Sequence, residues 1–194
     1  MQRQQALEIV RTYVKNEALV RHMFSVEAVM RAYAEQLGKD VELWGLTGLL
    51  HDFDWEIHPN DHKHPLAGLP ILREAGAPEI ILDAIAGHSD HTGVPRQTLM
   101  AKALFACDEI TGLVTAVALV RPSRSLYDLE ASSVRKKWKD KAFAAGANRE
   151  VIAQGAQEFG VDLWQHVDFC IKAMRKIAND LDLEGTITLQ DAIN

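Results

Sequence analysis

The chain has 194 residues, 47% hydrophobic and 25% charged, which are proportions typical of a soluble globular protein. Its net charge of −6 argues against a general nucleic-acid binder, so we regard a nucleic acid as an unlikely partner. The two cysteines, Cys107 and Cys170, exclude a disulfide framework and an all-cysteine zinc site, and suit a reducing compartment. The chain opens on a polar stretch unlike a signal peptide and has no run of 18 or more apolar residues. We therefore expect a cytoplasmic protein with no membrane span.

Helical spacing of apolar residues dominates the N-terminal quarter of the chain. After a short first stripe, a longer one covers residues 19–37 and stops at Gly38, a residue that commonly ends helices. Asp40 is placed to cap a third helix that runs to His51. His22 lies on the apolar stripe of the second helix, so its side chain is expected to point inward.

Loops and shorter helices are expected next. Residues 52–64 have the composition of a loop, and Pro65 suits the first turn of a helix that ends near Gly76. Pro78 opens another helix, whose apolar stripe continues to His88. This arrangement places a second inward-facing histidine just before the following loop.

The remaining chain also has a helical pattern. A long helix is expected from about 97 to 120, with Asp108 on its apolar face. Residues 121–149 hold eight basic and three acidic residues, a local excess of five positive charges. Further helices are expected over 148–159 and 163–181.

Strand signals are scarce, and no repeat or linker divides the chain. We therefore expect an all-α fold and a single domain over residues 1–194. Its core motif region would span about 19–112, with a C-terminal helical extension over about 113–183.

Ionisable side chains on otherwise apolar helices are the main functional signal. His22, the adjacent pair His51 and Asp52, and Asp108 come from three separate helices. A buried carboxylate costs several kcal/mol or more unless it is paired or bound to a metal. Imidazole and carboxylate groups are natural ligands of divalent ions such as Mn²⁺, Fe²⁺, Co²⁺, Ni²⁺ and Zn²⁺.

The order His22, His51-Asp52, Asp108 resembles the His … His-Asp … Asp motif that defines the HD superfamily of metal-dependent phosphohydrolases. A closer resemblance is to the HDIG-type subgroup, because His64-Pro65-Leu66-Ala67-Gly68 is similar to its His-Pro-x-x-Gly and His88 to its next histidine position. The chain differs from the cyclic-dinucleotide phosphodiesterases of that subgroup, which have two adjacent histidines where this sequence has His88-Ser89.

The resemblance implies an HD-domain helical bundle around one or two divalent ions, drawn from Mn, Fe, Mg, Ni, Co and Zn. His22, His51, Asp52 and Asp108 would hold the first ion. Asp52, the expected catalytic residue, would bridge to a second ion held by His64 and His88, with His91 as a further candidate. The implied reaction is hydrolysis of a phosphate ester by metal-activated water, and the implied substrate is a nucleotide or another small phosphorylated metabolite.

Other interpretations remain open at this stage. A lone inward histidine is usually a core residue, and a basic segment is usually a solvated face. The functional alternative is that Arg121 or Lys141 holds a substrate phosphate. In the 52–64 loop, Glu56, His58 and His62 are weak candidates for proton transfer to a leaving group. An HD-type di-iron oxygenase and a non-catalytic domain that binds metal or nucleotide are the alternative functions.

Overall fold

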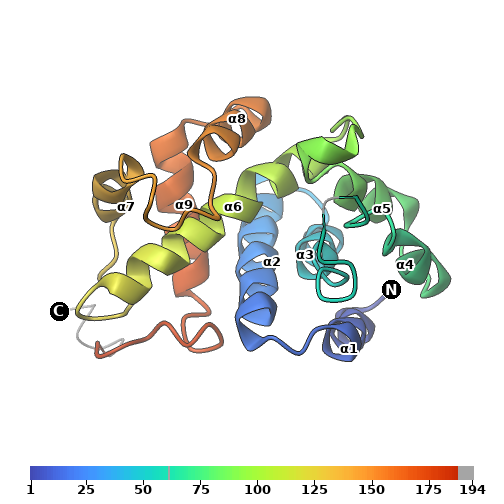
Figure 1. Ribbon diagram of the computed structural model, residues 1–194, viewed down its shortest axis with the longest axis horizontal. Coiled ribbons are helices and arrows are strands. Elements are labelled where there is room, and N and C mark those ends of the chain that lie inside the picture. Colours follow the sequence, from blue (N-terminus) through green and yellow to red (C-terminus); the bar gives the residue numbers. More distant parts are fainter. Residues whose placement is uncertain (61, 188–194) are drawn as a thin grey trace. The chain divides into compact units, whose positions relative to one another are not determined.

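The computed structural model describes residues 1–60 and 62–187, and every regular element in these ranges is a helix (Figure 1). The all-α prediction is therefore confirmed. The elements in chain order are α1 (Arg3–Tyr13), α2 (Glu17–Leu37), α3 (Val41–Leu50), α4 (Leu69–Glu74), α5 (Glu79–Ala86), the 3-10 turn η1 (Asp90–Thr92), α6 (Leu99–Val120), α7 (Ala131–Trp138), α8 (Arg149–Phe159) and α9 (Leu163–Arg175). The chain folds as two compact units, Met1–Phe105 and Ala106–Asn194, and α6 is continuous across their boundary. A single domain over the whole chain stays a prediction.

The first unit is built around α3, which packs against α1, α2 and α5 (Figure 1). Every residue from Trp44 to Leu50 is buried, so α3 has no solvent-facing side over that stretch. A helix that is apolar on all sides is stable in water only when other elements surround it. The His-Asp dipeptide follows this central helix directly, so the fold places it inside the unit.

Local contacts fix both ends of α2 and the start of α3, and the stop at Gly38 and the cap at Asp40 lie where the sequence predicts them. The Asn16 side chain accepts a hydrogen bond from the backbone of Ala18 at the start of α2, and Gly38 ends that helix with a φ of 62°. Asp40 Oδ1 accepts a hydrogen bond from the backbone N–H of Leu43, 2.9 Å away, at the start of α3. These contacts satisfy amide groups that the first turn of a helix leaves without partners.

The backbones of α2 and α3 approach closely at Gly48. A Cβ atom at this position would lie 2.8 Å from the backbone nitrogen of Glu27 on α2. The missing side chain at Gly48 therefore lets α3 lie against α2. His22 lies on α2, and His51 directly follows α3.

The structure differs from the sequence predictions at α4, α7 and α9, the last of which ends at Arg175 rather than near residue 181. The helix expected from Pro65 begins at Leu69 instead, because Pro70 is the proline that occupies its first turn. A further helix, α7, lies within the basic segment where none was expected. Its one buried residue is Val134, so the sequence shows little apolar periodicity there.

In the second unit, α7 and α8 each pack against α9. Asn148 caps α8 and Asp162 caps α9, as their hydrogen bonds to first-turn amides show. Among the helices in the described ranges, α6 alone is long and apolar enough to cross a membrane, with a mean hydropathy of 1.8. However, 61% of that stretch is buried inside the protein, and core helices of soluble proteins meet the same criteria.

Candidate metal centre

The carboxylate of Asp52 lies between two pairs of histidines. Its Oδ1 atom is 3.2 Å from Nε2 of His64 and 3.5 Å from Nε2 of His88. Its Oδ2 atom is 3.5 Å from Nε2 of His51 and 3.7 Å from Nε2 of His22. Each carboxylate oxygen therefore faces one histidine pair, the arrangement of a carboxylate that bridges two ions.

The two histidines within each pair are spaced as ligands of one ion would be. Nε2 of His22 and Nε2 of His51 are 3.2 Å apart, and the same distance separates the Nε2 atoms of His64 and His88. Two nitrogen ligands with bonds of about 2.0–2.1 Å, at angles between octahedral and tetrahedral, lie about 2.8–3.4 Å apart. Both pairs fall within this range.

Two of the histidines are oriented by the ends of the helices that they follow. His51 comes directly after α3, and its Nδ1 lies 2.8 Å from the carbonyl oxygen of Gly48. His88 comes two residues after α5, and its Nδ1 lies 2.6 Å from the carbonyl oxygen of Ile85. The last carbonyls of a helix have no partner within the helix, so each imidazole donates an Nδ1–H to one of them. This hydrogen bond leaves Nε2 as the atom that faces Asp52.

His64 is oriented by a side chain that the sequence analysis did not identify. Its Nδ1 lies 2.8 Å from Oδ1 of Asp54, a carboxylate with no exposed surface. The sequence offers no periodic signal for this pair, because the described residues between the partners, 55–60 and 62–63, lie outside any helix. Trp55 packs edge-on against the same imidazole, with ring centroids 4.9 Å apart.

The acceptor atoms of His64, His88 and Asp52 are arranged as they would be around a cation. With Nδ1 of His64 and of His88 acting as donors, both Nε2 atoms present lone pairs toward Asp52 Oδ1. The ligand atoms of these three residues lie within 4.8 Å of one another. Three electron-rich atoms at such distances repel one another unless a proton or a metal ion lies between them. Imidazole and carboxylate donors of this kind suit first-row divalent metals.

Burial and neighbouring charges shift the pKa values of two groups in the cluster, Asp52 and His64. Burial alone would raise the pKa of Asp52, but the surrounding histidines, His51 foremost, hold it well below its ordinary value of 3.8. Burial alone would lower the pKa of His64, yet its hydrogen bonds to Asp52 and Asp54 and their charges raise it to about 9. The site therefore favours positive charge between the carboxylates and the imidazoles.

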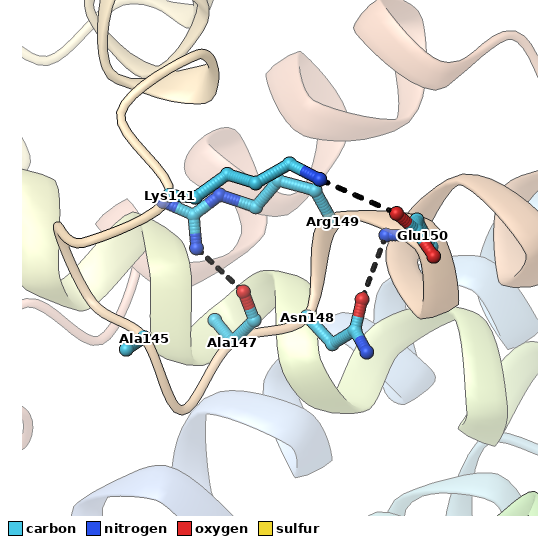
Figure 2. Close-up of a pocket in the computed structure, with 6 residues that line it drawn as sticks. All are labelled: Lys141, Ala145, Ala147, Asn148, Arg149 and Glu150. Carbon is cyan, nitrogen blue, oxygen red and sulfur yellow. Dashed lines mark hydrogen bonds and ion pairs between the residues drawn. The ribbon is translucent and has the colours of Figure 1, made fainter.

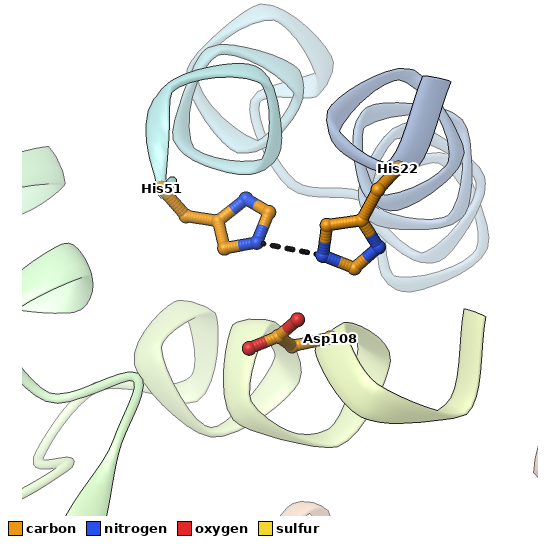
Figure 3. Close-up of side chains that lie close together, drawn as sticks. All are labelled: His22, His51 and Asp108. Atoms are coloured by element: carbon orange, nitrogen blue, oxygen red, sulfur yellow. Dashed lines mark hydrogen bonds between the residues drawn. The ribbon is translucent and has the colours of Figure 1, made fainter. Parts of the chain in front are cut away.

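The first set of ligands comes from α2, from the end of α3 and, by prediction, from α6. Figure 3 shows the rings of His22 and His51 pointing toward each other, with the 3.2 Å contact marked. Asp108, drawn with them, lies on α6 and follows the last residue of the first unit by three positions. Its assignment to the first ion stays a prediction.

The remaining polar candidates of the first unit have other contacts. Nε2 of His91 lies 2.8 Å from the backbone carbonyl of His64, so it contacts the chain rather than the ligand set. Glu56 accepts hydrogen bonds from the backbone amides of Lys15 and Asn16, between α1 and α2. That contact argues against the suggested role of Glu56 in proton transfer. The suggested roles of His58 and His62 in proton transfer stay predictions.

The structure gives little support to the suggested role of Arg121 in binding phosphate. Its guanidinium donates to the carboxylate and the backbone carbonyl of Asp128 and to the hydroxyl of Ser133. Arg121 also lies 13 residues beyond Asp108 along α6 and its last turn, or about 20 Å at the rise of an α-helix. That separation exceeds the reach of an arginine side chain to an ion held at Asp108.

Lys141 lines a pocket of about 150 Å³ at the start of α8 (Figure 2). Its ammonium lies 3.4 Å from Oε1 of Glu150, and both side chains are largely exposed. Arg149, buried beside it, donates to the carbonyls of Phe143, Ala144 and Ala147 and so holds the preceding loop. Binding of a substrate phosphate by Lys141 stays a prediction.

Comparison with known proteins places this geometry in a family. The family model of the HD domain matches residues 19–113. Ribonuclease Y of Nitratidesulfovibrio vulgaris strain DP4 is 29% identical over 176 residues, which are 89% of this chain and 33% of the relative. Ribonuclease Y of Lactobacillus acidophilus is 30% identical over 69% of this chain and 25% of its own length. Ribonuclease Y of Enterococcus faecalis is 28% identical over 87% of this chain and 33% of its own length.

The chain spans a third or less of the length of these relatives. No solved structure matches it. The matched region covers α2 to the middle of α6 and includes every proposed ligand. Residues 19–113 of this chain therefore form an HD domain, the domain of a superfamily of metal-dependent phosphohydrolases.

Proposed function

We propose that this protein is a metal-dependent phosphohydrolase whose centre holds two divalent ions on either side of Asp52. The observation that carries the proposal is the position of the Asp52 carboxylate, with one oxygen facing each histidine pair. A structural histidine cluster has no need of a carboxylate shared in this way. Two-metal sites of this type are common among enzymes that cleave phosphate esters.

The proposed ligands divide into two sets. His22, His51 and Asp108 would hold the first ion, His64 and His88 the second, and Asp52 both. When bound, such ions lower the pKa of a water molecule and offset negative charge on phosphoryl oxygens. The protein contributes fixed imidazole orientations, set by hydrogen bonds at the Nδ1 atoms of His51, His64 and His88. The resemblance of the second set to the added histidines of the HDIG-type subgroup supports our proposal that the domain belongs to that subgroup.

Water is the proposed nucleophile, and a covalent intermediate is not expected. The thiol next to a proposed ligand, Cys107, is fully buried, and burial raises its pKa well above the ordinary value. A buried thiol of high pKa is a poor nucleophile at neutral pH.

We propose two candidate classes of substrate. The sequence favours a nucleotide or another small phosphorylated metabolite. The relatives are ribonucleases by name, so the phosphodiester bond of RNA is a second candidate, and the expectation that nucleic acid is an unlikely partner has lost its support. The local positive charge of residues 121–149 is compatible with a polyanionic substrate.

One experiment addresses both the metal and the reaction. The purified protein is analysed for bound metals and then stripped and reloaded with Mn²⁺, Mg²⁺, Fe²⁺, Co²⁺, Ni²⁺ or Zn²⁺. Each form is tested on nucleotides, on bis-p-nitrophenyl phosphate and on single-stranded RNA. We expect about two ions per chain and phosphate-ester cleavage that is lost in Asp52→Asn.

The outcomes separate this proposal from its alternatives. Oxygen consumption with a mixed-valent iron signal, and no phosphate-ester cleavage with any metal, would indicate an oxygenase. Tight nucleotide binding with recovery of the intact ligand would indicate a regulatory binding domain. Full activity together with full metal content in Asp52→Asn would refute the proposed centre.

A further inference from the structure

Asp54 is a second carboxylate beside the metal centre, and it contacts only one member of the ligand set. It lies two residues after Asp52 and has no exposed surface. Its Oδ1 is 2.8 Å from Nδ1 of His64, while its Oδ2 is buried and has no hydrogen-bond partner in the described part of the chain. Among the described residues, the contact with His64 is therefore the side-chain interaction that offsets the cost of burying this carboxylate.

We propose that Asp54 is a positioning residue that holds His64 in the orientation and tautomer needed to bind the second ion. This inference rests on the metal centre proposed above. A carboxylate that accepts an Nδ1–H directs Nε2 to the metal and makes the imidazole a stronger donor. On the opposite side of the ring, Nε2 of His64 lies 3.2 Å from Oδ1 of Asp52. The imidazole thus lies between a carboxylate that orients it and a carboxylate that shares its ion.

The glycine at position 68 makes room for this carboxylate. A Cβ atom at Gly68 would lie 2.6 Å from Cβ and Cγ of Asp54 and 2.7 Å from its Oδ2. Gly68 has a φ of −80°, which any residue can adopt, so its backbone conformation does not require glycine. The short, buried side chain of Asp54 could move aside only by leaving His64. The space at Gly68 therefore serves the contact between Asp54 and His64.

The contact is specific to one ligand. His51 and His88 are oriented by the main-chain carbonyls of Gly48 and Ile85. Among these three histidines, His64 alone has a carboxyl group rather than a main-chain carbonyl as its partner at Nδ1. Loss of Asp54 should consequently weaken binding of the second ion and leave binding of the first ion unchanged.

The test measures metal affinity directly. Zn²⁺ and Mn²⁺ are titrated against a chromophoric chelator in the wild type, in Asp54→Asn and in Asp54→Leu. Removing such an orienting partner typically lowers metal affinity by about 10–100-fold. We expect a loss of this size for one of two ions in Asp54→Asn, and a larger loss in Asp54→Leu, which also lacks the hydrogen-bond acceptor. Gly68→Ala should behave like the Asp54 variants.

Glu27→Gln is the matched control. Glu27 is another buried carboxylate of the first unit, but it pairs with Arg3 and Arg31 rather than with a histidine. This variant should lose stability and keep both metal affinities. Equal losses of metal affinity in Glu27→Gln and Asp54→Asn would overturn the positioning role, because the effect would then be a general one of removing a buried charge.

A second measurement needs no variant at Asp54. Nitrogen-15 spectra of histidine-labelled wild type loaded with Zn²⁺, assigned with His64→Gln, should show a proton on Nδ1 of His64 and the metal on Nε2. The opposite tautomer would overturn the inference. Two tightly bound ions that are indifferent to Asp54 would also overturn it and leave the proposed function intact. A wild type that binds no metal would refute both.

Discussion

Nε2 of His64 lies 3.2 Å from Oδ1 of Asp52, although the two residues are 12 positions apart in the sequence. Asp52 lies two residues after the end of α3, the central helix of the first unit, whereas His64 precedes α4. The loop brings the chain back to the end of α3, and its proposed ligand, His64, lies in described residues 62–68, which form turns. One carboxylate consequently faces both proposed ligand sets.

Replacing Asp52 should be more damaging than replacing either neighbouring ligand alone. Asp52→Asn removes the charge shared by both sets, so we expect metal content to fall by more than one ion per chain and activity by at least about 10²-fold. His51→Gln should remove one ion and leave the other measurable. Elemental analysis and steady-state kinetics with Mn²⁺ check both expectations. Equal metal content in the two variants would contradict the bridging role.

A methyl group at Gly48 should destabilise the first unit. It would lie 2.8 Å from the backbone nitrogen of Glu27, and a helix backbone cannot move aside as a flexible side chain can. Overpacking of this kind costs about 1–3 kcal/mol, so the urea midpoint of Gly48→Ala should fall. Gly112→Ala is the control, because a Cβ there meets nothing within 4 Å. That variant lies within a helix and should gain up to about 1 kcal/mol. Similar midpoints for the two variants would argue against the close approach of α2 and α3.

His166 should make the stability of the second unit sensitive to acid. Burial lowers its pKa, and its Nε2 lies 2.8 Å from the carbonyl oxygen of Ala106. Below its pKa in the unfolded chain, about 6.5, this histidine binds a proton in the unfolded chain but not in the folded one. The free energy of unfolding therefore falls as the pH falls from about 6.5 to the lower pKa of the folded state. Urea unfolding at pH 7.5 and pH 5.0 should show a smaller loss in His166→Gln than in the wild type. An identical loss would show that this histidine does not contribute.

Exposed lysines of the second unit should affect binding of RNA if RNA is the substrate. Lys136 on α7 is exposed and forms no ion pair in the described part of the chain, whereas Lys172 on α9 pairs with Asp168. Lys136→Glu should therefore weaken binding of single-stranded RNA and reduce its salt dependence, by a slope of about 0.7 for each phosphate that is no longer neutralised. Lys172→Glu changes the net charge equally and should have the smaller effect. Fluorescence anisotropy at several salt concentrations measures both, and equal effects would indicate charge repulsion alone.

Helices with strong local signals could be predicted from the sequence. The stop at Gly38 and the cap at Asp40 act within a few residues, so α2 ends and α3 begins as expected. The short helix α7 has one buried residue, Val134, and its formation depends on packing against α9, which no local pattern shows.

The candidate site was predictable where a ligand lies on or next to a helix. His22, His51 and His88 stand out because each lies on an apolar stripe or continues one. The Asp54–His64 contact could not be predicted in this way, because it depends on how the intervening turns return the chain. The same applies to Glu56, whose partners lie about 40 residues away between α1 and α2.

The space at Gly68 links two sequence positions that are 14 residues apart. Because the Asp54 carboxylate fills the volume that a side chain at position 68 would occupy, a larger residue at 68 is compatible only with a smaller one at 54. The two positions should therefore change together among related chains. A relative with glycine at position 54 would be free to carry alanine or serine at 68 and would need another group to orient its histidine.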